Sequence, residues 1–229
     1  MSSFNNDLRQ REHRRVFNVD GLCQLAAQSV KRSPDDIFAL KKLAEGGWHR
    51  TFLITMHDGF QMVARIPYPV TVPKYFTVAS EVATMAFLRS SGLPVPEVYG
   101  YSPVPDNAAE TEYIFTEFVK GISLSDIWFE LEEKDIISVL RQLTELESKM
   151  TLTAFPAGGS LYYTEDSEKV SRGIPLKDKR FSVGPDTRLP LWYGKRSQLD
   201  VDRGPCRHLC FFFFYHFSKL TDNYRRKCR

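Results

Sequence analysis

The chain has 229 residues, of which 42% are hydrophobic and 26% are charged, a composition typical of soluble globular proteins. Its net charge of +3 comes from basic ends, at residues 1–16 and 203–229, so no nucleic-acid-binding face is predicted for the body of the protein. No run approaches the ~20 apolar residues that span a bilayer, and four cysteines in a chain of this length do not indicate a disulfide framework.

The first part of the chain predicts a helix followed by three antiparallel strands. Apolar residues repeat at helical spacing over residues 18–32. Alternating residues then predict strands over 38–43, 52–56 and 60–66, and Asp58-Gly59 favours a tight turn between the last two. In the third strand, Met62, Ala64 and Ile66 share one face, and Arg65 lies on the other.

A helix and a further strand follow this meander. Two prolines predict a loop over residues 68–75, and Thr77 or Ser80 is expected to begin a helix that ends at Gly92. Residues 93–98 are rich in proline and should be extended, residues 102–110 form a polar connector, and residues 113–118 predict a strand.

The second half has a weaker pattern. Ser123-x-x-Asp126 indicates a capping box, and a longer helix is predicted over residues 133–150. Its expected buried side comprises Ile136, Leu140, Leu143 and Leu146. Residues 155–162 predict a short hairpin, and residues 165–204 lack regular structure apart from isolated apolar anchors at Phe181, Leu191, Trp192 and Tyr193.

Several residues have the order required for binding a nucleotide. Phosphoryl transfer uses backbone donors and a cation on the phosphates. Gly46 and Gly47 lie between two strands, Arg65 ends the third strand, and Glu81 on the following helix can pair with it. The strand at 113–118 leads to a hinge in which the backbone of Glu117 and Val119 would bind the adenine edge.

Each of these residues also has an ordinary structural explanation. A Gly-Gly pair is most often a plain turn, Arg65 can be a solvated strand residue, and Glu81 can be an exposed acid on a helix. The order of the glycines, Arg65, Glu81 and the hinge favours the nucleotide site more than any one member does.

Several separated blocks within residues 17–205 resemble the aminoglycoside phosphotransferase family. These blocks are Ala44–Phe52, Val63–Pro67, Glu81–Leu88, Gly92–Val98 and Tyr113–Gly121. The blocks Phe155–Tyr162 and Gly184–Gly194 are similar to a mitochondrial branch of that family. The resemblance implies a protein-kinase-like fold with ATP between two lobes and Mg²⁺ in the complete family. It also implies that Arg65 is the cation that binds the phosphates. Its implied location is mitochondrial, whereas the sequence alone would indicate the cytoplasm.

The chain also differs from the family pattern. The family pattern requires a His-x-Asp-x-x-x-x-Asn catalytic loop and a later Asp that binds magnesium. His208 and His216 begin no such loop, and Asp200-Val-Asp202 is expected to be a solvated loop. Cys206-x-His208-x-Cys210 fits no common zinc-ligand spacing. No catalytic residue and no metal ligand is therefore predicted in this chain.

The predicted fold class is α+β, protein-kinase-like, with an N-terminal lobe of about five antiparallel strands and one crossing helix, and an incomplete helical C-terminal lobe. The expected segments are an N-terminal extension with a helix over 1–34, the N-lobe over 35–120, the start of the C-lobe with a family-specific insert over 121–205, and a disordered, phenylalanine-rich basic tail over 206–229.

Three functional hypotheses remain open. The chain is an ATP-dependent phosphotransferase by descent that is inactive in this truncated form and binds ATP weakly. Alternatively, it is a non-catalytic interaction module in which a protein partner covers the exposed face of the C-lobe helices. A third possibility is a fragment of a gene model without an independent role.

Overall fold

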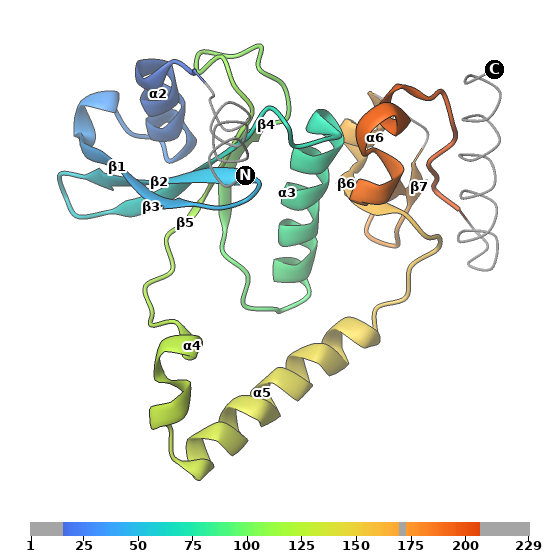
Figure 1. The fold of residues 1–229 in the computed structure, drawn as a ribbon. Coiled ribbons are helices and arrows are strands. Elements are labelled where there is room, and N and C mark those ends of the chain that lie inside the picture. Colours follow the sequence, from blue (N-terminus) through green and yellow to red (C-terminus); the bar gives the residue numbers. More distant parts are fainter. Residues whose placement is uncertain (1–15, 170–172, 207–229) are drawn as a thin grey trace, which may run out of the picture.

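The computed structural model describes residues 16–169 and 173–206, which form an α+β fold with two antiparallel sheets on either side of one long helix (Figure 1). The first described helix, α2 (Val19–Ser29), begins at Asn18, whose side chain accepts a hydrogen bond from the amide of Gly21 at 3.0 Å. This contact satisfies one of the amides that the start of a helix leaves unbonded. The helix predicted over residues 18–32 is confirmed, and it ends at Ser29.

The larger sheet has five strands in the order β1-β2-β3-β5-β4, with every neighbouring pair antiparallel. A 3₁₀ turn (Pro34–Asp36) leads into it. Gly59, with φ +84°, closes the turn between β2 and β3, which confirms the predicted meander. The strands are β1 (Ile37–Glu45), β2 (His49–Met56), β3 (Gln61–Pro67), β4 (Val98–Ser102) and β5 (Tyr113–Glu117).

The crossing helix α3 (Lys74–Ser90) begins earlier than the sequence predicts. Pro73 precedes its first residue, so Lys74 and Tyr75 are helical although they were expected in the loop over 68–75. The expected start at Thr77 or Ser80 is therefore wrong. The physical reason is that the fixed φ of proline is compatible with the position just before a helix, so Pro73 does not extend the loop. Gly92, with φ +79°, follows the end of the helix as predicted.

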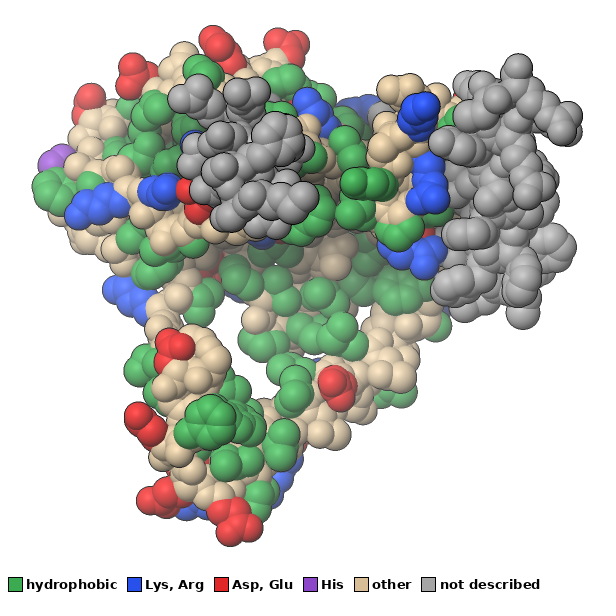
Figure 2. All heavy atoms as spheres, viewed as in Figure 1, with side chains coloured by type: hydrophobic (Ala, Val, Ile, Leu, Met, Phe, Trp, Pro, Cys, Tyr) green, Lys and Arg blue, Asp and Glu red, His purple; other side chains and the backbone are tan. Residues whose placement is uncertain are grey.

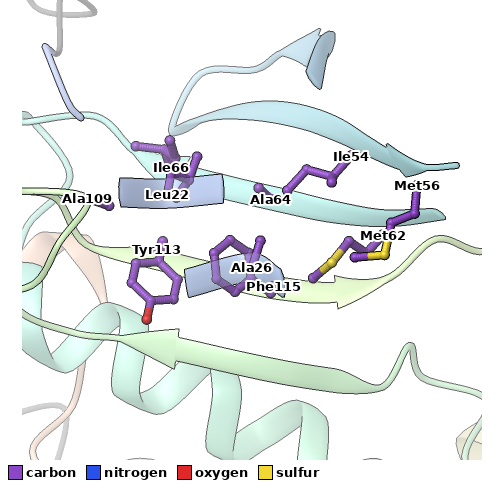
Figure 3. Packing of buried hydrophobic residues seen from close by; sticks show 10 residues of the cluster. All are labelled: Leu22, Ala26, Ile54, Met56, Met62, Ala64, Ile66, Ala109, Tyr113 and Phe115. Atoms are coloured by element: carbon purple, nitrogen blue, oxygen red, sulfur yellow. The ribbon is translucent and has the colours of Figure 1, made fainter. Parts of the chain in front are cut away.

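The two faces of the larger sheet bury different helices. Leu22 and Ala26 of α2 pack with strand residues such as Ala64 and Phe115 in one cluster (Figure 3). On the opposite face, Ile114 packs against α3. Neighbouring residues in β5 point to opposite faces because side chains alternate along a strand. The face predicted for β3 is confirmed, since Met62, Ala64 and Ile66 are buried.

A second, smaller sheet covers the other side of α3. It consists of β6 (Ser160–Tyr163), β7 (Ile174–Pro175) and β8 (Phe181–Gly184) in the order β6-β8-β7. The predicted hairpin over residues 155–162 is wrong, because β6 pairs with β8. Residues 165–204 also contain more regular structure than expected, including most of α6 (Thr164–Glu168) and 3₁₀ turns at Leu189–Leu191 and Gly194–Gln198.

The helices α4 (Leu124–Ile127) and α5 (Glu133–Thr151), joined by a 3₁₀ turn at Trp128–Glu130, extend away from the two sheets (Figure 1). Ser123 precedes α4, but its side chain makes no capping hydrogen bond and lies 2.7 Å from the hydroxyl of Ser125. The predicted capping box is therefore wrong.

The side of α5 that was expected to be buried is open. No α5 residue is buried, and Leu140 and Leu143 are 49% and 50% exposed. Helical periodicity marks the apolar side, but the described part of the chain does not bury any of its residues. Within residues 16–169 and 173–206, no helix is long and apolar enough to cross a bilayer. The predicted tail lies outside the described residues, apart from Cys206.

Candidate phosphate-binding site

The centre of the candidate site is an ion pair between the larger sheet and α3. Arg65 lies on β3 and points to the α3 face, where its Nη1 donates to Glu81 Oε1. The two side chains are 30% and 24% exposed, so the pair is accessible at one side. The structure therefore brings together the two charged residues that the sequence singled out, although they lie sixteen positions apart.

His49, at the start of β2, completes this cluster. Its Nδ1 lies 3.3 Å from Arg65 Nη2, and its Nε2 lies 3.7 Å from Glu81 Oε2. Among the described residues, this Nε2 is buried without a hydrogen-bond partner. Burial and the adjacent Arg65 lower the pKa of His49 below its ordinary value, and Glu81 acts in the opposite direction. The ring is therefore neutral at neutral pH.

His49 is not among the site residues predicted from the sequence, although the hairpin register indicates its position. The turn at Asp58-Gly59 pairs Thr51 with Arg65, and two residues further along each strand it pairs His49 with Pro67. Because side chains two residues apart share a face, His49 and Arg65 must lie diagonally on the same face of the sheet. Counting back from the Asp-Gly turn would have found the contact.

Main-chain hydrogen bonds fix the Gly46-Gly47 turn beside this cluster. The Gly46 amide donates to the carbonyl of His49 at 3.0 Å. The carbonyl of Trp48 accepts from the Tyr68 amide at 3.0 Å and from the hydroxyl of Thr71 at 2.9 Å. The segment after β3 thus holds the turn, and His49 links the turn to Arg65.

The fold itself does not demand glycine in this turn. Neither Gly46 nor Gly47 has a positive φ. A Cβ at Gly47 would meet no described atom within 4 Å, and one at Gly46 would make only an ordinary contact, at 3.7 Å, with the carbonyl of His49. Both residues are exposed. Open backbone of this kind is suited to close approach by a ligand.

The acid that precedes the turn is neutralised by its neighbours. Glu45 accepts hydrogen bonds from Lys42 at 2.8 Å, from Arg50 at 3.0 Å and from the hydroxyl of Tyr68 at 3.1 Å. These bonds, with that of Lys42 the largest contribution, lower the pKa of Glu45 to about 2. Its negative charge is therefore balanced and does not oppose an anion at the turn.

The predicted hinge residues lie further along the sheet. Glu117 pairs with Met62, three residues along β3 from Arg65, or about 10 Å at the usual rise of a strand. The amide of Glu117 donates to the carbonyl of Glu97 at 2.8 Å, so this amide is already occupied. Val119 follows the strand and is 61% exposed. The structure thus groups the turn, Arg65 and Glu81, and leaves the hinge at a distance.

A pocket of about 730 Å³ lies elsewhere, between α3 and the second sheet. Its lining includes Ser80, Thr84, Phe155, Ser160 and Thr187, and none of its lining residues within the described ranges is charged. This described lining therefore offers no cation to a phosphate.

In the described ranges, no three His, Cys, Asp or Glu side chains come together as a metal site. Asp202, in the loop considered above, accepts a hydrogen bond from the amide of Gly204 at 2.9 Å.

Sequence comparison finds curated relatives in fungi. The chain is 43% identical over 169 residues to a subtelomeric hrmA-associated cluster protein of Aspergillus fumigatus, a match that covers 73% of this chain and 33% of that protein. It is 32% identical over 201 residues to altered inheritance of mitochondria protein 9, mitochondrial, of Lodderomyces elongisporus, covering 77% and 32%. The protein of the same name in Yarrowia lipolytica is 28% identical over 228 residues, covering 88% and 39%.

The resemblance to a mitochondrial branch is therefore confirmed at the level of named relatives. The chain spans about a third of the length of the curated relatives that it matches. No family model matches the chain, so its assignment to the aminoglycoside phosphotransferases stays a prediction. No solved structure matches it either.

Proposed function

We propose that the larger sheet and α3 form the nucleotide-binding lobe of a kinase-like phosphotransferase, and that the Gly46-Gly47 turn and Arg65 bind the phosphates of ATP. The observation that supports this proposal is the Arg65–Glu81 ion pair beside an exposed glycine turn. A strand cation held by a helix acid, next to open backbone, is the arrangement that phosphoryl-transfer proteins use to hold phosphate.

The electrostatics of the cluster suit an anion. An arginine carries five N–H donors, of which Glu81 takes one and His49 another. Among residues 16–169 and 173–206 its other donors have no hydrogen-bond partner, and we propose that they bind phosphate oxygens, which a guanidinium holds in a fixed, planar geometry. Because Glu45 is paired elsewhere and His49 is neutral, Arg65 is the cation that meets the ligand.

The chain covers about a third of the length of its curated relatives, and the part that it covers contains the proposed phosphate-binding residues. We therefore propose nucleotide binding as the role of these residues, with any Mg²⁺ entering as a complex with ATP. We also propose a mitochondrial location, since relatives such as that of Lodderomyces elongisporus are named mitochondrial.

ATP-dependent thermal stabilisation of the 229-residue chain tests the proposal. We expect ATP to raise the melting temperature of the wild-type protein and of Arg32→Gln, but not of Arg65→Gln. Arg32 is a matched control, because it pairs with Asp58 at the turn end of the β2–β3 hairpin and its side chain is 31% exposed, close to the 30% of Arg65. Equal stabilisation of the wild type and Arg65→Gln, or none of the wild type, would contradict the proposal.

A second candidate function, an interaction module, is favoured by the exposed apolar side of α4 and α5. Hydrophobic side chains gather on these helices in Figure 2. Phe129, in the 3₁₀ turn between the two helices, is 96% exposed, and Ile122, just before α4, is 75% exposed. Exposed apolar patches of this kind mark sites where another polypeptide packs. Stabilisation only by a bound protein, and not by ATP, would favour this function over nucleotide binding.

A further inference from the structure

His49 connects the glycine turn to the Arg65 guanidinium through both its main chain and its side chain. Its carbonyl accepts the Gly46 amide at 3.0 Å, and its Nδ1 lies 3.3 Å from Arg65 Nη2. Only 18% of the side chain is exposed. Because one residue makes both contacts, the position of the turn and the orientation of the guanidinium are fixed together.

The chemistry of the contact defines the state of the imidazole. Arginine can only donate, so Nδ1 of His49 must accept and the ring proton must lie on Nε2. The Nε2–H then points towards Glu81 Oε2, 3.7 Å away. The charged groups that face the ring are Arg65 from β3 and Glu81 from α3. A protonated ring would place a second cation, with a donor at Nδ1, against Arg65.

We propose that neutral His49 is a positioning residue for the phosphate-binding cation. Glu81 holds one amino group of Arg65 and His49 Nδ1 holds the other, so the guanidinium cannot rotate about a single contact. The guanidinium is then held in one orientation by the residue that also accepts the Gly46 amide. This inference rests on the proposed function, because it assigns His49 a role in binding the same phosphate.

Two substitutions separate the acceptor from the volume of the ring. In His49→Asn, the amide oxygen can replace Nδ1 as an acceptor, whereas His49→Leu fills similar space without one. We expect His49→Asn to bind ATP within about twofold of wild type, and His49→Leu to bind about tenfold more weakly, the scale of one hydrogen bond to a charged group. In an Arg65→Gln background, His49→Leu should cause no further loss.

The measurement is an ATP titration of the full 229-residue chain by calorimetry, with circular dichroism to check that each variant is folded. Equal affinity of His49→Leu and wild type overturns the inference. Equal weakening by the Asn and Leu substitutions also overturns it, because the acceptor would then not matter. An additive loss in the double variant would show that His49 acts independently of Arg65, and this result also overturns the inference.

A proton NMR titration of the His49 ring tests the contact without nucleotide. We expect a His49 pKa below the ordinary value in the wild type, and a higher pKa in Arg65→Gln, because the adjacent cation is removed. An unchanged pKa overturns the inference even if ATP binds. If the wild type binds no ATP, the proposed function fails, and a pKa that still depends on Arg65 shows that the contact is only structural.

Discussion

The helices α3 and α5 have similar lengths, 17 and 19 residues, but very different surroundings. Val78 and Val82 of α3 face the larger sheet, while Phe76 and Phe87 pack on aromatic rings of the smaller one. In contrast, no residue of α5 is buried. The comparison teaches that an amphipathic pattern predicts which side of a helix is apolar, but not what covers it.

Helix α3 also contributes Glu81 to the candidate site. Glu81 extends from α3 to Arg65, so the position of the acid depends on how firmly both sheets hold the helix. On the far side, the buried Asp166 accepts hydrogen bonds from the hydroxyl of Tyr101 at 2.5 Å and from that of Tyr75 at 3.3 Å. Asp166 belongs to α6, which directly follows β6, so these contacts support α3 from the side of the second sheet.

Removing an aromatic ring that covers α3 should have the largest effect on stability. Phe181 is 1% exposed and packs on Phe87, with ring centroids 5.4 Å apart. We expect Phe181→Ala to lower the free energy of unfolding by about 3–5 kcal/mol. The matched change on α5, Leu143→Ala, should cost less than about 0.5 kcal/mol. Urea denaturation measures both, and similar costs would show that the two helices are equally covered.

High pH should lower the stability of the protein through Tyr75 of α3, whose hydroxyl donates to Asp166. Burial, followed by the charge of Asp166, raises the pKa of this hydroxyl from 10 to about 12. A raised folded-state pKa contributes stability that is complete below pH 10 and is lost as the pH rises towards 12. We expect the unfolding midpoint to fall over this range, and to fall less in Tyr75→Phe.

Tyr193 supplies the control for the alkaline measurement, since it is 68% exposed. Tyr193→Phe should follow the wild-type pH profile. If Tyr75→Phe and the wild type lose the same stability between pH 10 and pH 12, the contact between Tyr75 and Asp166 does not hold α6 against α3.

Polar substitutions on α5 should have the smallest effect on stability. We expect the double variant Leu140→Gln, Leu143→Gln to unfold within about 0.5 kcal/mol of wild type, because both side chains are half exposed. The same variant should associate less in analytical ultracentrifugation, since it removes part of the apolar surface. A loss of more than about 2 kcal/mol would instead mean that this side is packed in solution.

Local patterns in the sequence were sufficient for much of the fold. The Asp58-Gly59 turn and the alternating residues on either side define β2, β3 and their register without distant contacts. The short strand β8 could not be predicted in this way. Its partner β6 ends 18 residues earlier at Tyr163, and a strand of four residues has too few positions to show alternation.

The contacts of the candidate site also differ in whether the sequence could predict them. Arg65 and Glu81 could be predicted to meet, because a strand residue and an acid on the next helix have a known order in kinase-like sequences. The occupied amide of Glu117 could not be predicted, since its partner, the carbonyl of Glu97, lies in the irregular segment before β4. Contacts made by irregular backbone leave no periodic signal.

The central claim is that the Gly46-Gly47 turn and Arg65 bind the same anion. An ATP titration followed by NMR, with the chain labelled with ¹⁵N, tests it most directly. We predict that the amides of Gly46 and Gly47 and the Nε of Arg65 shift together with one dissociation constant, that amides of α5 do not move, and that Arg65→Gln abolishes the glycine shifts. Glycine shifts that persist unchanged in Arg65→Gln would contradict the claim.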